Sequence, residues 1–455
     1  METKETNADN PPQKYETEMK HLLTDEGIEE NGGVSENTES LRSIFSQVFF
    51  PFLIAGLGTV AAGLILDIIQ YWSVFKNLPE MFILVPSLLG LKGNLEMTLA
   101  SRLSTQANLG NLDQTKEQYQ IAKGNLALVQ CQATVVGFLA SLFAILVDYI
   151  EEGTFSINHA FLICASSLLT ASIASFLLGC VTIGVVIISR KCQINPDNVA
   201  APVAASLGDV VTLSLLSVCS QFLYSLDDII KQWIQIPIII ILISLVPLWW
   251  LIAYKNEYTR IILYTGWIPV ITAVVIASAG GYILDTTVSQ YKEIAVFQPV
   301  INGVGGNLVA VQASRISTSL HQRTKLGILP TGDIKRCIDP FSAFFGKNPH
   351  VRTANLLLFM VIPGQYFFLM IIHVLKYDSP DVPPLFYVLY PVAALIQVAI
   401  LLYSAYCMIL WMWKWSIDPD NSSIPYLTAL GDLLGTALLA IVFYVLYSSK
   451  NYTPA

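Results

Sequence analysis

Long apolar runs dominate this chain of 455 residues and constrain its fold more than any other feature. A helix needs about 20 mainly apolar residues to cross the hydrocarbon core of a bilayer. Only 13% of the residues are charged, whereas soluble domains carry about 25%. We therefore expect an all-α polytopic membrane protein. Eleven segments are apolar enough to be spans, namely 44–70, 82–105, 124–147, 159–189, 200–224, 234–254, 260–284, 295–319, 354–376, 384–411 and 424–448.

The first 42 residues differ from the rest, with eleven acidic and four basic side chains. This composition is typical of disorder, so we assign 1–43 to an acidic cytosolic tail. Lys and Arg in the loops set the orientation of membrane helices. With the tail inside, the inward loops carry thirteen basic residues and the outward loops carry five. We therefore expect a plasma-membrane protein with a cytosolic N-terminus and an extracellular C-terminal tail at 449–455.

Sequence elements recur in the same order in two parts of the chain. GNLEMTLASRLST at 93–105 and GNLVAVQASRIST at 306–318 are identical at eight of thirteen positions. PDNVAAPVAASLGDVVTLSLL at 196–216 and PDNSSIPYLTALGDLLGTALL at 419–439 are identical at nine of 21 positions. The chain is therefore interpreted as a tandem duplication.

Each copy contains five of the predicted spans. We place a first repeat at 44–225, a linker with the sixth span at 226–259, and a second repeat at 260–448. The extra span restores the direction of the second copy, so the two repeats should be parallel and related by an axis along the membrane normal. The fifth helices of the repeats would then face each other across that axis.

Each repeat carries one aspartate, Asp209 or Asp432, near the middle of its fifth span. An ionised aspartate at the centre of a membrane helix costs about 2.5–3.5 kcal/mol on insertion scales, and two facing carboxylates also repel. The apolar runs around them contain no Lys or Arg. A permeating cation of charge 2+ would neutralise the pair.

The residues around these aspartates fit a hydrated divalent ion. Hard oxygen ligands suit Mg²⁺ or Ca²⁺, and Mg²⁺ keeps its waters, which favours a wide site with few carboxylates. A transition metal would call for His or Cys, which are absent here. We expect Mg²⁺ as the transported substrate. The residues predicted to share a helix face with an aspartate are Ala205 and Thr212 beside Asp209, and Thr428, Gly435 and Thr436 beside Asp432.

A second repeated element is PSLLGLKGN at 86–94 and PVINGVGGN at 299–307. Its Pro and Gly content predicts a break in the helix, which a membrane tolerates where the backbone lines a water-filled cavity or is buried in protein. We expect Asn94 and Asn307 to line the pore. A kinked packing helix with an interhelical amide bond is the alternative.

Two further aspartates, Asp67 and Asp285, end the repeated elements GLILD and GYILD at the outer ends of the first and seventh spans. They could form a mouth that attracts cations. A solvated helix end is the alternative for both.

Other classes of protein also place aspartates in a membrane. Presenilin-like proteases use a carboxylate pair that shares a proton and activates water, but their GxGD motif fails here because Ser206 and Ala429 replace its first glycine. No YD partner lies within a span, so we expect no enzyme. In a receptor or scaffold the carboxylates would join helices, and the duplicated small and Gly-rich elements argue against this reading.

These motifs together resemble a known family. The PDN…P…LGD pattern, with Asp seven residues after Pro, resembles the last membrane helix of the MgtE magnesium channels, and GGN resembles part of their second helix. The tandem arrangement resembles solute carrier family 41 over 44–448. The resemblance implies a Mg²⁺ transporter whose selectivity aspartates are Asp209 and Asp432. Ala205 and Thr428 fall where the bacterial family exposes backbone oxygens to hydrated Mg²⁺.

The resemblance also bears on symmetry and coupling. Thr212 stands where the second repeat has Gly435, which implies an asymmetric pore. Sodium-coupled efflux is implied for family members, while channel-like passage without coupling stays open, since no separate Na⁺ site can be assigned. The expected partners are Mg²⁺, Na⁺ and the lipid bilayer, without nucleic acid, and one chain would suffice as a pseudo-dimer.

Overall fold

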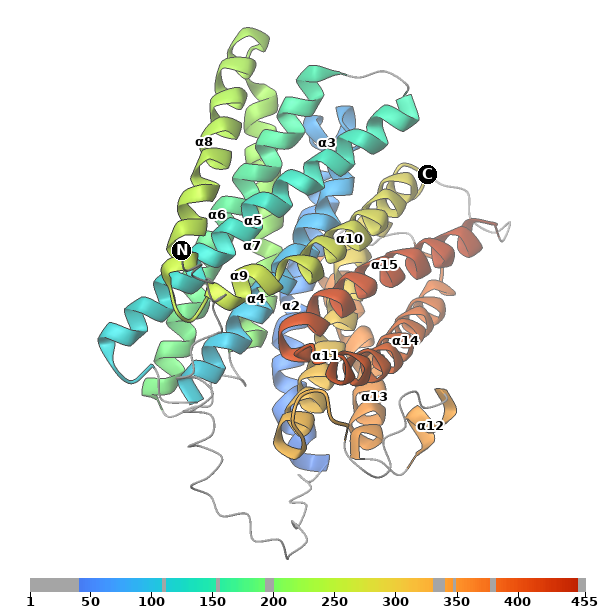
Figure 1. Cartoon of the computed structure of the whole chain (residues 1–455). Helices are drawn as coiled ribbons and strands as arrows, with labels where there is room; N and C mark the ends of the chain where they lie inside the picture. The colour runs from blue at the N-terminus through green and yellow to red at the C-terminus, as the bar shows by residue number, and fades with distance from the viewer. Residues whose placement is uncertain are drawn as a thin grey trace, which may run out of the picture. The chain divides into compact units, whose positions relative to one another are not determined.

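The computed structural model describes residues 41–108, 112–152, 156–192, 200–329, 340–346, 349–376 and 382–448. Regular structure in these ranges is helical throughout (Figure 1). The long helices are α2 (Leu41–Ile69), α4 (Met81–Asn108), α5 (Thr115–Glu152), α6 (Ile157–Lys191), α7 (Ala200–Ser225), α8 (Asp228–Lys255), α10 (Trp267–Val288), α11 (Ile294–Arg323), α13 (Pro349–Leu375), α14 (Phe386–Lys414) and α15 (Pro419–Ser448). Three short helices are α3 (Ser73–Asn77), α9 (Arg260–Thr265) and α12 (Pro340–Phe345). Of the tail predicted over 1–43, residues 1–40 lie outside the described residues, as does the predicted tail at 449–455, whereas residues 41–43 belong to α2.

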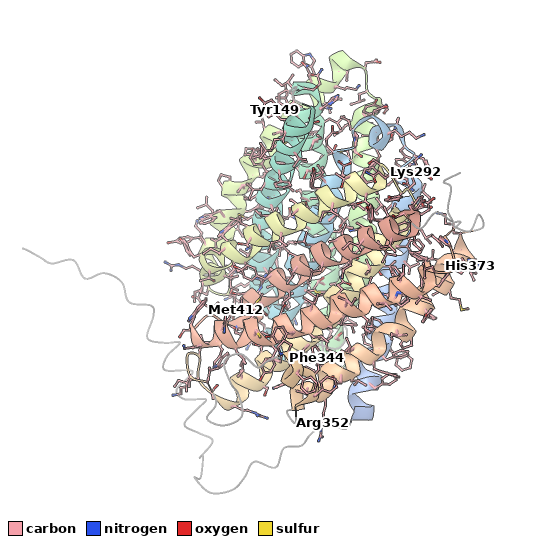
Figure 2. All side chains as sticks on the ribbon, turned by 90° about the vertical axis from the view of Figure 1, so that its right-hand side faces the viewer. Tyr149, Lys292, Phe344, Arg352, His373 and Met412 are labelled. Atoms are coloured by element: carbon pink, nitrogen blue, oxygen red, sulfur yellow. The ribbon has the colours of Figure 1, made fainter. Side chains whose placement is uncertain are left out.

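The long helices coincide with the predicted spans and confirm an all-α polytopic membrane protein. Ten of them are long and apolar enough to cross a bilayer. Figure 2 shows Arg352 and His373 at opposite ends of one of these, α13. The exception is α4, which carries Lys92, Glu96 and Arg102. Because α4 packs against helices on several sides, it does not need the apolar surface of a lipid-facing helix.

The helix break predicted within 86–94 and 299–307 is wrong. α4 continues through Pro86 and α11 continues through Pro299 without interruption. Membrane helices tolerate internal Pro and Gly where neighbouring helices compensate for the lost backbone bond. An interruption occurs instead in the predicted span 260–284, which is divided at Gly266 between α9 and α10.

The first long helix of each repeat packs on the second long helix of the other repeat. α2 of the first repeat packs on α11 of the second, and α10 of the second packs on α4 of the first. Gly63 of α2 abuts the backbone oxygen of Val296, and the equivalent Gly281 of α10 abuts that of Ile83. A Cβ at either glycine would overlap this oxygen. Such reciprocal contacts are what two copies related by a two-fold axis produce.

The described residues from Leu41 onward form one compact unit. α2 also packs on α7 of its own repeat, as α10 does on α15. By contrast, α8 packs mainly on α5 and α6, and only 6% of its most apolar stretch is buried inside the protein. The repeats are thus units of sequence that interleave in space, while α8 lies at the periphery as a connection.

Candidate cation site

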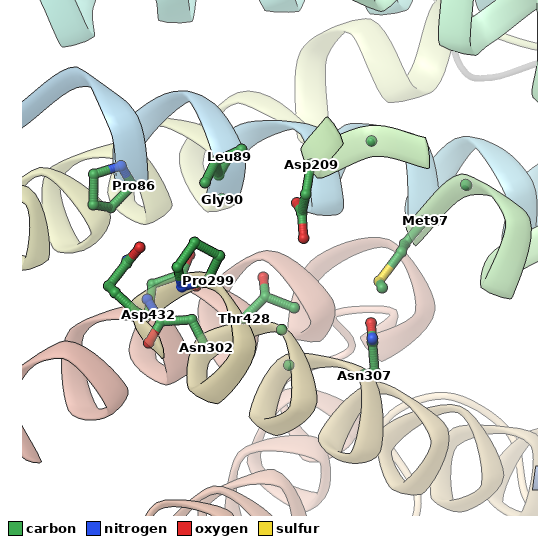
Figure 3. Close-up of a pocket in the computed structure, with 15 residues that line it drawn as sticks. Pro86, Leu89, Gly90, Met97, Asp209, Pro299, Asn302, Asn307, Thr428 and Asp432 are labelled. Carbon is green, nitrogen blue, oxygen red and sulfur yellow. The ribbon is translucent and has the colours of Figure 1, made fainter. Parts of the chain in front are cut away.

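A cavity of about 50 Å³ lies where four helices meet (Figure 3). The helices are the second and fifth long helices of each repeat, α4 and α7 from the first and α11 and α15 from the second. Asp209 of α7 and Asp432 of α15 both line this cavity. The structure therefore brings together the two carboxylates that the duplicated sequence singles out.

In the described part of the chain, the fifth helices α7 and α15 both border the cavity but do not pack closely on each other. α7 packs mainly on α2, α4 and α6, and α15 packs mainly on α4, α10, α11 and α14. The second helices α4 and α11 therefore complete the wall, and the cavity lies among all four. The aspartates meet across a cavity and not across a helix interface.

Asp209 reaches the cavity from α7. Figure 3 shows its carboxylate directed toward the side on which Thr428 lies. A second acidic side chain is close by, because a Cβ at the preceding Gly208 would be 3.5 Å from Oε2 of Glu96 on α4. Glu96 is buried, with 2% of its surface exposed. The first repeat thus brings a second acid near its aspartate.

Asp432 has a tighter environment. Its Oδ2 atom is buried and accepts no hydrogen bond from the described residues. A Cβ at Gly90 of α4 would lie 2.5 Å from this oxygen, so the absence of a side chain at position 90 gives the carboxylate its space. Asp209 lines the same cavity as Asp432.

The residues predicted beside the aspartates differ in position. Thr428 lines the cavity, and its hydroxyl donates to the Ile424 carbonyl at 2.9 Å. Thr212 and Gly435 are not among the lining residues. The Thr212 hydroxyl donates to the Gly208 carbonyl of its own helix at 2.6 Å. The side chain of Ala205 lies outside the described part of the chain.

Gly435 lies beside two amide side chains. A Cβ there would overlap Oδ1 of Asn302 and would lie 2.5 Å from Nε2 of Gln397. Gly435 therefore makes room for two amide side chains behind the cavity. Of the two asparagines in the repeated GN element, Asn307 lines the cavity (Figure 3), and the side chain of Asn94 lies outside the described residues.

Asp67 and Asp285 do not line the cavity. Asp67 forms an ion pair with Lys376, with Nζ and Oδ2 2.8 Å apart, and accepts a hydrogen bond from Gln70 at 3.0 Å. Asp285 is buried, with 7% of its surface exposed. A carboxylate already neutralised by a lysine attracts a cation weakly, so the geometry of Asp67 favours a structural link between α2 and the end of α13.

Comparison with known proteins gives the family. The model described as "MgtE: Divalent cation transporter" matches residues 85–219 and 298–442, well over half of the chain. The chain belongs to the MgtE family. The two matched segments begin at equivalent positions of the repeats. They contain the four helices that line the cavity, except for the first turns of α4 and α11 and the last six residues of α7 and of α15.

Relatives of this MgtE-family chain are named as members of solute carrier family 41. "Solute carrier family 41 member 2" of Mus musculus is 50% identical over 440 residues, which cover 95% of this chain and 76% of the relative. The Homo sapiens protein of that name is 50% identical, with coverage of 95% and 77%. "Solute carrier family 41 member 3" of Rattus norvegicus is 46% identical, with coverage of 89% and 88%.

These relatives confirm the resemblance to solute carrier family 41 and the expectation that the chain is a divalent cation transporter of the membrane and not an enzyme. Among solved structures, "Crystal structure of eukaryotic MATE transporter AtDTX14" covers 88% of this chain and 95% of its own, at 12% identity. The TM-score of this match is 0.21.

Several residues that line the cavity were not among those predicted from the sequence. Gln298 and Asn302 of α11, one helical turn apart, line it together with Gly90 and Met97 of α4. The available signal was an asymmetry inside the repeated element, since Asn302 stands where the first repeat has Leu89. Among the described residues, no three His, Cys, Asp or Glu side chains gather to hold a metal.

Proposed function

We propose that this chain carries Mg²⁺ across the membrane through the cavity between its repeats. The observation that supports this most is the convergence of Asp209 and Asp432, one from each repeat, on a single cavity. Two carboxylates supply the charge that neutralises a divalent cation. The remaining polar lining includes amides and a hydroxyl, which are hard oxygen ligands of the kind that Mg²⁺ prefers.

The aspartates are the direct test of this proposal. In proteoliposomes that contain the purified full-length chain, Asp209→Asn and Asp432→Asn should each reduce Mg²⁺ flux by about a hundredfold, because truncating one partner of a buried charged contact costs several kcal/mol. Asp113→Asn is the matched control, since Asp113 is an exposed carboxylate outside the cavity. Unchanged flux in both cavity variants would refute the proposal.

Coupling is a separate part of the proposal. We propose sodium-coupled efflux of Mg²⁺, with uncoupled passage as the alternative. The relatives are named solute carriers, which supports carrier-type transport. Imposing an opposing Na⁺ gradient on the same proteoliposomes should accelerate Mg²⁺ transport severalfold, whereas equal rates with and without the gradient would favour channel-like passage.

We also propose a plasma-membrane location with a cytosolic N-terminus and an extracellular C-terminus, supported by the basic inner loops. Single cysteines can test this after the loop residues Cys192 and Cys337 are replaced by Ser. Cysteines at 150–158 and 377–383 should react with an impermeant maleimide on intact cells, and those at 325–347 should not. The reverse pattern would invert the topology without affecting the Mg²⁺ proposal.

A further inference from the structure

A second pocket lies away from the cation cavity, where α7 ends and α8 begins. Its volume is about 220 Å³, against about 50 Å³ for the cation cavity. The first turns of α6 and α8 and the last turn of α7 form most of its wall. The second repeat contributes none of the described residues that line it. This pocket therefore belongs to the first repeat and the linker helix.

Several side chains that line this pocket offer hydrogen-bond donors. Gln235 of α8 is 1% exposed, and its Nε2 atom donates to none of the described residues. The Nδ1 atom of His159 is buried and also has no partner among them. The hydroxyl of Tyr224 accepts a hydrogen bond from Nδ2 of Asn77 at 2.6 Å, and a phenol can accept and donate at once. Buried polar atoms are almost always partnered in folded proteins, so the amide of Gln235 points to a ligand that accepts hydrogen bonds.

The same pocket carries positive charge. Lys231 of α8 lines it, and Nζ of this lysine is 5.2 Å from the centroid of the Tyr224 ring. None of the described residues that line the pocket is acidic, and Asp227, one turn before Lys231, is not among them. A ligand that accepts several hydrogen bonds beside an ammonium group is an anion. Phosphate oxygens meet this description, and lysine is a common partner of phosphate.

Two tryptophans of α8 indicate the depth of the pocket in the membrane. Trp233, two residues after Lys231, is 79% exposed, and Trp250 lies near the other end of the helix. Tryptophan is enriched where the bilayer meets water. These two residues are 17 positions apart, a rise of about 26 Å along a helix, which is close to the roughly 30 Å of the hydrocarbon core. The pocket therefore lies at the level of the lipid headgroups.

An apolar stripe leads from the pocket along α8. Gln232 lines the pocket, and Ile236, Ile240 and Ile243 follow it at intervals of four, four and three residues. Residues at such intervals share one face of a helix. Ile240 and Ile243 are 60% and 40% exposed. A lipid acyl chain can lie along this stripe while its phosphate group occupies the pocket.

We propose that this pocket binds the phosphate group of a phospholipid. Lys231 supplies the positive charge, Gln235 and Tyr224 donate hydrogen bonds to phosphate oxygens, and the acyl chains lie along α8. Because α7 and α8 make few direct contacts, a ligand that touches both joins the linker helix to the first repeat. The site lies outside the cation cavity, and the proposal does not depend on the proposed function.

The experiment measures the thermal unfolding midpoint of the purified full-length chain in detergent, at constant ionic strength, as one of three compounds is added. Phosphatidic acid carries the phosphate group and two acyl chains, diacylglycerol carries the same chains alone, and inorganic phosphate carries no chain. A ligand that binds only the native state raises the midpoint. Phosphatidic acid should raise it by several degrees, whereas the other two compounds should leave it unchanged.

Variants of the pocket test where the lipid binds. Lys231→Gln and Gln235→Leu should each raise the phosphatidic acid concentration that gives half of this shift about tenfold, as expected for losing one contact to a charged ligand. Lys292→Gln is the control for charge, because Lys292 also lies over a tyrosine ring, that of Tyr71 at 5.5 Å, and does not line the pocket. Gln365→Leu is the control for a buried amide, since Gln365 is 0% exposed and lies outside the pocket. Both controls should respond like the unchanged chain.

Each other outcome would overturn the proposal. An equal shift with diacylglycerol would mean that only acyl chains bind, and an equal shift with inorganic phosphate would mean that the ligand is a free anion. No shift with phosphatidic acid, or a shift that Lys231→Gln and Gln235→Leu leave unchanged, would refute the site. If either variant fails to fold, Tyr224→Phe keeps the ring and removes one hydroxyl. Its half-effect concentration should rise severalfold, and an unchanged value would again refute the site.

Discussion

The two repeats share a scaffold and differ at the cavity. Gly63 and Gly281 make the same contact with equivalent backbone positions, and α2 with α11 mirrors α10 with α4. At the cavity the agreement ends. α15 packs closely along α4, whereas the equivalent pair, α7 and α11, makes few contacts.

The side chains at the cavity diverge in the same way. The first repeat places Glu96 near its aspartate, where the second has Val309, and the second repeat provides Gln298 and Asn302 where the first has apolar residues. In a single chain each copy of a position can change independently. The duplication therefore preserves the helix packing, while the side chains that the two repeats contribute to the cavity can differ.

The largest expected effect tests the shared scaffold. Gly63→Val and Gly281→Val should each destabilise the fold by about 1–3 kcal/mol, because the new side chain meets a backbone oxygen that cannot move aside. The two losses should be similar, measured as thermal unfolding midpoints in detergent. Gly184→Val is the control, since a Cβ there has no neighbour within 4 Å. Markedly unequal losses would show that the two glycine contacts are not equivalent.

The next effect tests the difference at the cavity. A Cβ at Gly90 meets the movable carboxylate of Asp432, whereas a Cβ at the equivalent Gly303 overlaps Thr59 of α2. Gly90→Ala should lower Mg²⁺ flux roughly tenfold with little loss of stability, since it displaces one charged contact. Gly303→Ala should mainly lower the unfolding midpoint. Equal effects on flux would show that the two walls are functionally alike.

A smaller effect is expected at the ion pair between the repeats. Lys376→Met leaves the Asp67 carboxylate, 14% exposed, without its ammonium partner. The cost should be about 1 kcal/mol, below that of a fully buried pair, because solvent screens a partly exposed charge. The double variant with Asp67→Asn should be less destabilised than Lys376→Met alone, as a double-mutant cycle would show. Additive losses would mean that the pair does not interact.

The smallest effect concerns an ion pair within the first repeat. Arg190 Nε and Asp113 Oδ1 are 3.0 Å apart, and this hydrogen bond, aided by the charge of Arg190, lowers the pKa of Asp113 below its usual value of 3.8. A lowered pKa means that the pair stabilises the fold above pH 3.8 and that this contribution is lost as the pH falls through the depressed value. Unfolding midpoints of the unchanged chain and Asp113→Asn should converge as the pH is lowered from about 6 to about 3. A constant difference would exclude this titration.

Much of the fold could be predicted from local sequence. Hydropathy gave the positions of the long helices, and the repeated motifs pointed to a pair of related halves with Asp209 and Asp432 in equivalent places. The continuity of α4 and α11 could not be predicted, because Pro86 and Pro299 interrupt helices in water but are compensated by neighbours in a membrane. The local sequence shows that a proline is present, whereas compensation for its lost backbone hydrogen bond depends on tertiary packing.

The polar side chains that α11 contributes to the cavity could not be predicted for a similar reason. Gln298 and Asn302 are ordinary polar residues in a Gly-rich stretch until Thr436, more than 130 residues later, is placed beside them. The role of Asp67 likewise depends on Lys376, which belongs to the other repeat. Contacts between segments that are distant in the sequence determine these roles, and such contacts cannot be predicted from the periodicity of one helix.

The peripheral position of α8 has a consequence for how the molecule could be divided. Since each half supplies a wall against which the other half's first helix packs, neither would keep its native surface alone. A break within α8 would cut only the covalent connection between the two repeats. Two polypeptides produced together from such a split gene should find each other and rebuild the transporter, whereas either one by itself should not.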